Sequence, residues 1–366
     1  MSTTITTLPT PATTILKLRP SEQNKTEEES YRYAHLLPHF AQDHYPPLTP
    51  FEHVDPGHRA LSHPNPRSFL DNATVVQLTP NLGSEVHGVN LATLSDDGRD
   101  QLALEVARRG LVVFRDQHEF IDRGPEFYKA WGRHFGRRLS FPELHIHPTS
   151  GHPEGYPEIH LVYRDANSTF NFEVDESITT TMWHSDVSYE LQPPGLTTFF
   201  LLSQPETGGD TLFTSQVSTL RKLSPQFVAF LRTLKAVHSG VEQANFSRSG
   251  KRGGIVRREP VENVHPVVRK HPVTGEEALY VNRQFTRRIV GLKREESETL
   301  LKFLYDHIDK SGDNQARVKW QPGTVVLWDN RITAHSAIID YKDSRERRHG
   351  ARITPQAERP VGDLIV

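Results

Sequence analysis

The chain has 366 residues, enough for one large domain or two medium ones with a full hydrophobic core. Its 43 Lys and Arg residues nearly balance 45 Asp and Glu residues, which argues against nucleic acid as a partner. The absence of cysteine excludes a disulfide scaffold, a thiolate metal site and a cysteine nucleophile. No apolar run approaches the length of a membrane span and the N-terminus lacks a secretory layout, so we expect a cytoplasmic protein that does not bind membranes.

The N-terminal part differs in composition from the rest of the chain. Ten of the 26 prolines lie in its first seventy residues, which begin Thr-rich and show little apolar periodicity. Such segments bury too little apolar surface to fold alone. We therefore expect residues 1–72 to form a flexible N-terminal extension, disordered at its start and draped over the main body further along. The alternative is a small separate domain.

The first half of the main body, residues 73–366, begins with a predicted strand at 73–80 and a helix at 94–110. Ser95 is the expected N-cap of this helix, and Gly110 is expected to end it. A buried strand at 111–117 and a second helix at 127–136, with apolar positions three and four apart, follow.

The second half is dominated by short β-forming runs. They are predicted at 196–202, 211–215, 277–282 and 323–330, with one helix at 295–312. Many short strands with scattered helices favour a sandwich or jelly roll over alternating βαβ units. The predicted fold class is mainly β with flanking helices (α+β).

Three His-X-Asp triplets occur, a spacing that can place an imidazole and a carboxylate on one side of a strand. The triplet at 53–55 lies in the proline-rich extension, where nothing is expected to fix its geometry. The triplet at 307–309 lies in a predicted helix, where side chains two residues apart diverge. Only His184 and Asp186, in an extended run before a Pro-Pro-Gly turn, are expected to be ordered and on one face.

A third ligand would complete a 2-His-1-carboxylate triad, the arrangement typical of non-haem Fe(II) oxygenases. His335 is the best candidate, because it follows the strongly β-forming run 323–330 as a residue at the rim of a barrel would. The alternative is an ordinary strand histidine that bonds to backbone.

A basic cluster follows 13 and 17 residues after His335, at Arg348 and Arg352. On a strand these two side chains point to the same side, whereas Arg347 points away. Two guanidiniums that face one pocket repel each other unless anions fill it, and each can clamp an oxyanion. One clamp would suit the distal carboxylate of 2-oxoglutarate, and the second implies an anionic substrate. The alternative is a solvated basic surface or a nuclear-import patch.

Residues 74–358 resemble the taurine dioxygenase family of Fe(II)/2-oxoglutarate-dependent oxygenases, and most of all its fungal sulfonate dioxygenase branch. The resemblance rests on the runs WHSDVSYELQPPGLTT, PETGGDTLFTSQ and WDNRITAHSA and on the length and extension of the chain. It implies a double-stranded β-helix (jelly roll) core, one Fe(II), and 2-oxoglutarate and O2 as co-substrates. Residues 73–366 would then be the catalytic domain.

The resemblance also implies roles for individual residues. The matching positions are His184, Asp186 and His335 for iron, Thr211 and Arg348 for 2-oxoglutarate, and Arg352, His147 and Phe285 for the substrate. Two positions depart from the pattern of taurine enzymes, because Ser150 replaces a tyrosine and Thr180 replaces an asparagine. In the family these two positions contact the substrate, so the resemblance implies a substrate other than taurine.

The implied activity is hydroxylation of the carbon next to the sulfur of a small sulfonate, which releases sulfite and an aldehyde. The same chemistry on an alkyl sulfate, or on a carboxylate-bearing amino acid or secondary metabolite, is an open alternative, since Arg352 would grip a carboxylate equally well. A non-catalytic jelly-roll binding protein is a third reading. We expect a small anionic substrate, mobile lids at 163–180 and 245–260, and a homo-oligomer.

Overall fold

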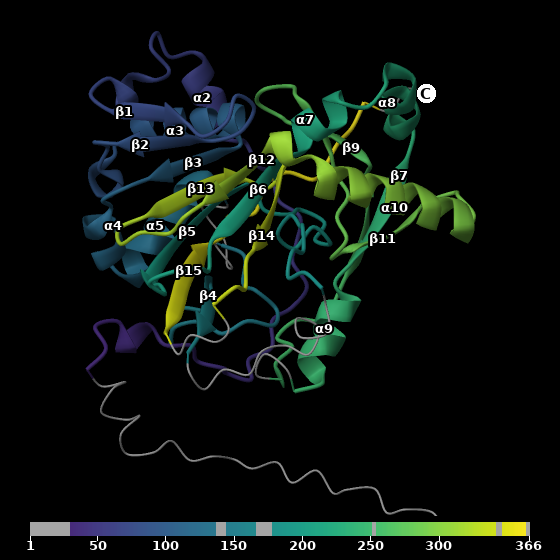
Figure 1. The fold of residues 1–366 in the computed structure, drawn as a ribbon. Coiled ribbons are helices and arrows are strands. Elements are labelled where there is room, and N and C mark those ends of the chain that lie inside the picture. Colours follow the sequence, from purple (N-terminus) through teal and green to yellow (C-terminus); the bar gives the residue numbers. More distant parts are fainter. Residues whose placement is uncertain (1–29, 137–143, 166–177, 251–253, 342–345, 364–366) are drawn as a thin grey trace, which may run out of the picture. The chain divides into compact units, whose positions relative to one another are not determined.

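The computed structural model describes residues 30–136, 144–165, 178–250, 254–341 and 346–363. The chain divides into residues 1–36, in whose described part lies the turn η1 (Ala34–Leu36), and a compact unit of residues 37–366. All further elements belong to the second unit (Figure 1). Among the described residues, no helix combines the length and apolar character needed to cross a membrane.

The largest element of this unit is a seven-stranded mixed sheet. Its strands, in spatial order, are β1 (Thr74–Gln77), β2 (Ser84–His87), β3 (Leu111–Phe114), β13 (Val325–Asp329), β5 (Leu196–Ser203), β15 (Arg348–Ile353) and β4 (Ile159–Arg164). Strands β2 and β3 pair in parallel, and the other neighbours are antiparallel. The central strands β3 and β13 are buried at every position, which explains their continuous apolar runs.

Three smaller antiparallel sheets complete the β structure. They consist of β12 (Gln315–Val318), β6 (Thr211–Ser215) and β14 (Thr333–Ala337); of β11 (Thr286–Ile289), β7 (Lys235–Ser239) and β8 (Glu262–Pro266); and of β10 (Glu277–Leu279) and β9 (Val268–Lys270). One buried cluster joins the seven-stranded sheet to the β12-β6-β14 sheet through residues that include Val113, Phe199, Phe213, Val318 and Trp328. The core therefore lies between these two sheets.

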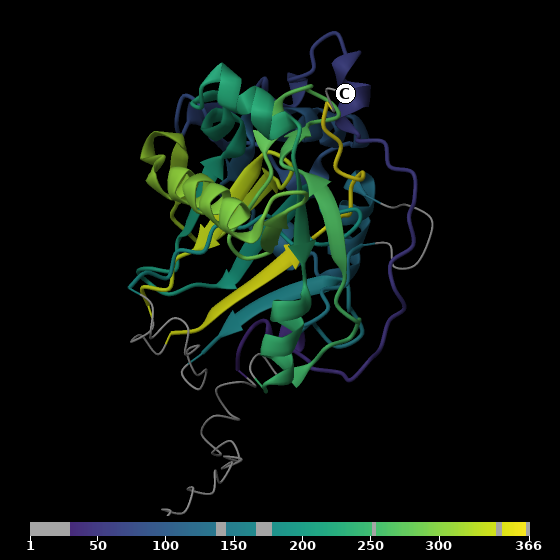
Figure 2. The same ribbon diagram turned by 90° about the vertical axis from the view of Figure 1, so that its right-hand side faces the viewer.

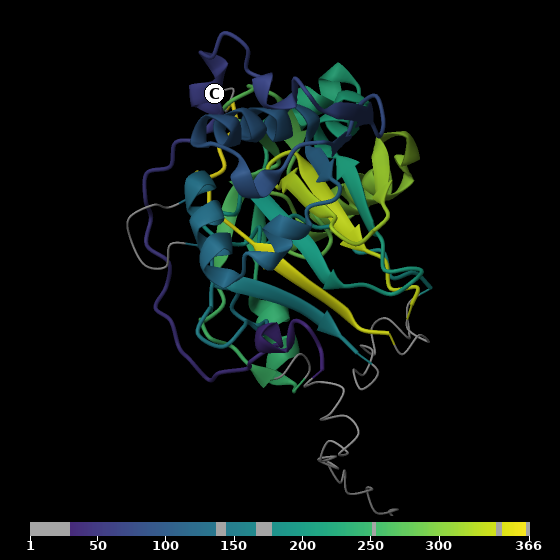
Figure 3. The ribbon, with the colours of Figure 1, turned by 90° about the vertical axis from the view of Figure 1, so that its left-hand side faces the viewer.

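Helices cover the outside of the β structure. They are α2 (Gly57–Leu61), α3 (Asp96–Arg109), α4 (His118–Asp122), α5 (Pro125–Phe135), α7 (Gln216–Arg221), α8 (Pro225–Arg232), α9 (Val241–Arg248) and α10 (Arg294–Lys310), with short turns η2 (Ser68–Leu70), η3 (Leu91–Thr93) and η5 (Gly312–Asn314). Figure 3 shows α3 and α5 against the outer face of the seven-stranded sheet, and Figure 2 shows α10 and α9 on the opposite side. Helix α3 begins with the Ser95 side chain accepting from the Gly98 amide and ends at Gly110, whose φ is 71°.

The prediction of a mainly β fold with flanking helices is confirmed. The predicted helices correspond to α3, α5 and α10, and the predicted strands correspond to β1, β3, β5, β6, β10 and β13. The strand predicted at 277–282 is wrong at its end, because β10 stops at Leu279. The chain then turns, since the Asn282 side chain accepts from the Phe285 amide and its carbonyl accepts from the Thr286 amide.

The segment before β1 contacts the main body in its described part. Arg59 pairs with Asp100, and Arg67 pairs with Glu105, so residues from 57 onward are tied to α3. Residues 37–72 belong to the same compact unit as the sheets. The domain boundary at residue 72 and the flexibility of the extension stay predictions, and residues 1–29 lie outside the described residues.

We expect Phe120→Ala to lower the free energy of unfolding by about 3–5 kcal/mol. The Phe120 ring is fully buried and contacts Phe127, Trp131 and Phe200 at centroid distances of 5.2, 5.0 and 5.7 Å, so its removal leaves a cavity under α4 and α5. Urea unfolding measures the loss. Phe303→Ala, which removes a half-exposed ring of α10, should lower the free energy of unfolding clearly less. Equal losses in the two variants would mean that the packing of α4 and α5 stabilises the sheet little.

Candidate functional site

The candidate metal ligands meet where two distant backbone segments pair. The His184 amide donates to the His335 carbonyl at 3.0 Å, and the His335 amide donates to the His184 carbonyl at 2.9 Å. This pairing brings the two imidazole centroids within 4.2 Å of each other. Asp186 follows two residues later, and its Oδ1 lies 3.8 Å from His184 Nε2 and 3.6 Å from His335 Nε2. One atom from each residue therefore lies within 4.8 Å of the others.

Neighbouring groups orient two of these side chains. His184 Nδ1 donates to the Met182 carbonyl at 2.9 Å, which leaves the lone pair of Nε2 for a metal. The His335 ring is buried and lies against Phe213 and Trp328, with centroid distances of 5.9 and 4.9 Å. Burial, and then the nearby His184 and Arg352, lower the pKa of His335 well below its ordinary value, so the imidazole is neutral and able to coordinate.

The triad of His184, Asp186 and His335 has buried polar atoms without hydrogen-bond partners in the described part of the chain, which also suits a metal ion. Both ring nitrogens of His335 and Oδ2 of Asp186 are buried without a hydrogen-bond partner among the described residues. Buried polar atoms of this kind are costly unless something binds them. Two neutral imidazoles and one carboxylate form the donor set that non-haem Fe(II) oxygenases use.

Arg348 and Arg352 lie at two positions of β15 that share one face, as the sequence predicts. Both guanidiniums lie over the Phe199 ring, at 5.9 and 5.4 Å from its centroid. Arg352 Nη1 lies 2.5 Å from Asp186 Oδ1, so this face of the strand is the face of the metal ligands. Arg347 contacts the Tyr163 hydroxyl instead.

Arg348 is a buried cation that no carboxylate of the described residues pairs with. Its Nε and Nη2 donate to the Gly209 carbonyl at 3.3 and 3.1 Å, and burial lowers the pKa of its guanidinium. Gly209 is required here, because its φ is 69° and a Cβ would lie 3.0 Å from Arg348 Nε. Thr211 begins β6 two residues further on, and its hydroxyl accepts from Trp320 Nε1. The turn that leads into Thr211 and β6 therefore lies against the Arg348 guanidinium.

The remaining predicted residues divide into two groups. The Phe285 ring lies 6.3 Å from the His184 ring, and so it borders the triad. The His147 ring contacts the His160 ring at a centroid distance of 4.2 Å, and His160 is the strand partner of Arg352. By contrast, Thr180 accepts from the Ile339 amide, the Ser150 carbonyl accepts from Arg257, and no hydrogen bond within the described ranges joins either residue to the triad.

The predicted lids are described only in part. Residues 166–177 of the first and 251–253 of the second lie outside the described residues, and α9 occupies the start of the second. Their mobility stays a prediction.

Asn330 is a site residue to which sequence reasoning assigned no role. Its Oδ1 accepts from the Asp186 amide at 3.1 Å, and its Nδ2 donates to the Gly195 carbonyl and the Thr197 hydroxyl at 3.1 and 2.7 Å. The buried amide thus ties the backbone of the carboxylate ligand to β5. The signal was its place in WDNRITAHSA, between a buried strand and His335.

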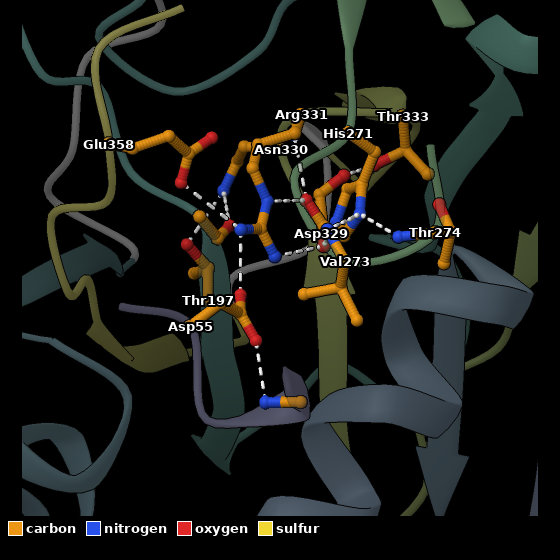
Figure 4. A network of polar contacts seen from close by, with 12 residues as sticks. Asp55, Thr197, His271, Val273, Thr274, Asp329, Asn330, Arg331, Thr333 and Glu358 are labelled. Atoms are coloured by element: carbon orange, nitrogen blue, oxygen red, sulfur yellow. Dashed lines mark hydrogen bonds and ion pairs between the residues drawn. The ribbon is translucent and has the colours of Figure 1, made fainter. Parts of the chain in front are cut away.

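A buried charge cluster holds the turn that carries Asn330 (Figure 4). Arg331 pairs with Asp329 at 2.6 Å, Asp55 at 2.7 Å and Glu358 at 3.3 Å, and His271 Nε2 donates to Asp329 at 3.0 Å. Burial alone would raise the pKa of Asp329, but Arg331 and His271 hold it well below its ordinary value. The expectation that nothing fixes the 53–55 triplet is therefore wrong for Asp55, because Arg331 holds it.

Comparisons with known proteins agree with this geometry. Residues 74–354 match the family described as Taurine catabolism dioxygenase TauD, TfdA family. The chain belongs to this family. An alpha-ketoglutarate-dependent sulfonate dioxygenase of Saccharomyces cerevisiae is 46% identical over 355 residues, 96% of this chain and 82% of that protein. An alpha-ketoglutarate-dependent dioxygenase of Penicillium expansum is 41% identical over 345 residues, 92% of this chain and 90% of that protein.

The fold has relatives among solved structures as well. The crystal structure of a taurine dioxygenase from Burkholderia xenovorans matches with a TM-score of 0.63 and 32% sequence identity, over 80% of this chain and 93% of that one. As a member of the family, the chain is an Fe(II)- and 2-oxoglutarate-dependent dioxygenase that uses O2. The reading as a non-catalytic binding protein is therefore wrong.

We expect Asn330→Ala to weaken Fe(II) binding about 10- to 100-fold, the usual effect of losing a group that orients a metal ligand. The Asp186 amide would lose its acceptor, and the ligand carboxylate would lose its fixed place. Anaerobic Fe(II) titration measures this. Asn314→Ala is the matched control, because Asn314 is an equally buried amide that contacts Thr219. If both variants bind Fe(II) alike, Asn330 does not position Asp186.

Proposed function

We propose that this dioxygenase hydroxylates the carbon next to the sulfur of a small sulfonate. The observation that carries the proposal is the position of Arg352. This residue lies four residues after Arg348 on β15, and its guanidinium reaches the carboxylate of Asp186. A second cation beside the triad supports an anionic substrate in addition to 2-oxoglutarate. Among anions, the name of the Saccharomyces cerevisiae relative favours a sulfonate.

In this proposal His184, Asp186 and His335 hold the iron through two imidazole nitrogens and one carboxylate oxygen, which leaves coordination positions open. When bound, the iron supplies O2 activation coupled to the decarboxylation of 2-oxoglutarate to succinate and CO2. We also propose that the seven-stranded sheet and the β12-β6-β14 sheet form the two walls of a double-stranded β-helix. The buried cluster between them supports this arrangement.

We assign the distal carboxylate of 2-oxoglutarate to Arg348 and Thr211. A buried guanidinium without a carboxylate partner among the described residues, beside a hydroxyl and a glycine turn, supports that assignment. The anion would pair with the charge of Arg348 and accept from the Thr211 hydroxyl. Such charge-assisted bonds are strong where water is excluded.

The substrate sulfonate is assigned to Arg352 and His147. The Phe199 and Trp328 rings flank the Arg352 guanidinium at 5.4 and 5.5 Å, and Phe285 borders His184, so apolar walls would exclude water and orient the C–H bond. Thr180 and Ser150 stay proposals for the rim of the pocket. Their hydrogen bonds to other residues give them no direct part in the chemistry.

The overall reaction balances without a further reductant. One oxygen atom enters succinate, and the other becomes a hydroxyl on the carbon that bears the sulfonate. The C–S bond then breaks, sulfur leaves with the bonding electrons as sulfite, and the hydroxyl loses its proton as the aldehyde C=O forms. The protein contributes the position of the C–H bond.

The test is a substrate panel of short alkanesulfonates, the corresponding alkyl sulfates and the corresponding carboxylates, each with Fe(II), 2-oxoglutarate and O2. We expect sulfite and succinate in equal amounts with a sulfonate, and none with Asp186→Ala, which removes the carboxylate ligand. Release of sulfate only, or hydroxylation of carboxylates only, would contradict the sulfonate assignment. Full activity of Asp186→Ala would contradict the metal assignment.

Arg348→Ala and Arg352→Ala should separate the two anion sites. Loss of a charge-assisted hydrogen-bond pair should weaken apparent affinity about 10- to 100-fold, toward the co-substrate 2-oxoglutarate with Arg348→Ala and toward the sulfonate with Arg352→Ala. Steady-state kinetics with each compound varied in turn measures both effects as changes in KM. If each variant weakens both compounds equally, the two arginines do not serve separate anions.

The cytoplasmic location, the homo-oligomer and the absence of nucleic-acid partners stay predictions. The lack of cysteine supports a reducing compartment, and the near-neutral charge supports a partner other than nucleic acid.

A further inference from the structure

His160 lies beside the proposed substrate anion site. It is on β4, where it pairs directly with Arg352 of the antiparallel strand β15. Directly paired residues of antiparallel strands point to the same face, with Cβ atoms about 4.5–5.5 Å apart. Because Arg352 reaches Asp186 on this face, the His160 side chain lies on the face of the metal ligands.

A second imidazole covers His160. The ring of His147 lies 4.2 Å from the ring of His160, with 32° between their planes. The Thr149 amide donates to His147 Nδ1 at 3.2 Å, so Nε2 of the neutral His147 carries the proton and is a hydrogen-bond donor. Two imidazoles and one guanidinium therefore gather on one patch beside the triad.

The number of these groups matches the shape of a sulfonate. An –SO3 group presents three oxygens in a tetrahedral arrangement, whereas a carboxylate presents two in a plane. Arg352 Nη1 donates to Asp186, and its buried Nε has no partner among the described residues, so the guanidinium can still donate to a further anion. Donors from His160 and His147 beside this guanidinium would approach an anion from other directions, which suits three tetrahedral oxygens better than two coplanar ones.

We propose that His160 is a substrate-binding residue that sets specificity, and that it forms a three-sided seat for the –SO3 group with His147 and Arg352. This inference rests on the proposed function and names a further residue that distinguishes sulfonates from carboxylates.

His160→Phe tests the inference, since it keeps an aromatic ring against His147 and removes both ring nitrogens. The KM for the best alkanesulfonate should rise about tenfold or more, and the apparent affinity for the co-substrate 2-oxoglutarate should not change. The ratio of kcat/KM for that sulfonate to kcat/KM for the carboxylate of the same carbon chain should fall. His160→Gln, which keeps a donor, should recover part of the sulfonate affinity.

Tyr163→Phe is the matched control on the same strand. Its ring pairs with His349 and its hydroxyl contacts Arg347, so it lies on the other face of β4 and should leave sulfonate kinetics unchanged. Direct sulfonate binding to the anaerobic enzyme, measured by calorimetry, gives a second reading that does not depend on turnover. His160→Leu gives the same comparison if the Phe variant does not fold.

The outcomes separate the inference from the proposed function. If the wild type releases sulfite and His160→Phe binds the sulfonate as tightly as the wild type, the inference is wrong and the proposed function stands. An equal loss of sulfonate and carboxylate affinity would also overturn it, because His160 would then serve any anion. If the wild type releases no sulfite from any sulfonate, the proposed function itself fails.

Discussion

The site depends on a reciprocal pair of backbone hydrogen bonds between His184 and His335. These residues are 151 positions apart, and the pairing forces their rings together before any metal arrives. His335 is already held in β14, and the pairing fixes the segment of His184 against that strand. The pairing uses only backbone groups, so both imidazoles keep a ring nitrogen that can coordinate a metal. Asp186 points to the same side as His184, because side chains two residues apart in an extended chain share a face.

The buried charges around Arg331 also help to fix the position of His335. Asp329 and Arg331 precede β14, and the cluster fixes the turn that contains Asn330 and leads into the strand of His335. Burial disfavours each charge, yet Arg331 and then Arg269 hold the pKa of Glu358 at about 2. Such a cluster loses much of its value when one partner is removed, because the remaining charge is left buried and unpaired. Rigidity at the metal site therefore rests on charges that never touch the reactants.

Much of this molecule can be predicted from its sequence, and the failures have physical causes. Local patterns are enough for α3, with Ser95 before it and Gly110 after it, and for the strands whose apolar runs are continuous. Short-range spacing also gives the shared side of His184 and Asp186 and the shared side of Arg348 and Arg352. Strand register does not, since nothing near His160 indicates that β4 pairs with β15. The Asp55–Arg331 pair joins residues 276 positions apart, and the proline-rich composition around Asp55 predicted a segment without fixed contacts.

Asp55 also bears on how short this enzyme can be made. The family match begins at residue 74, and a fragment cut there would keep all four sheets and the triad of His184, Asp186 and His335. It would also leave the fully buried Arg331 with one carboxylate fewer and strip α2 from α3. A trimmed enzyme that begins where the family match begins would thus carry a buried charge imbalance at Arg331, four residues before His335. The practical starting point for a minimal version lies upstream of the prolines that flank Asp55, within a segment whose composition alone invites deletion.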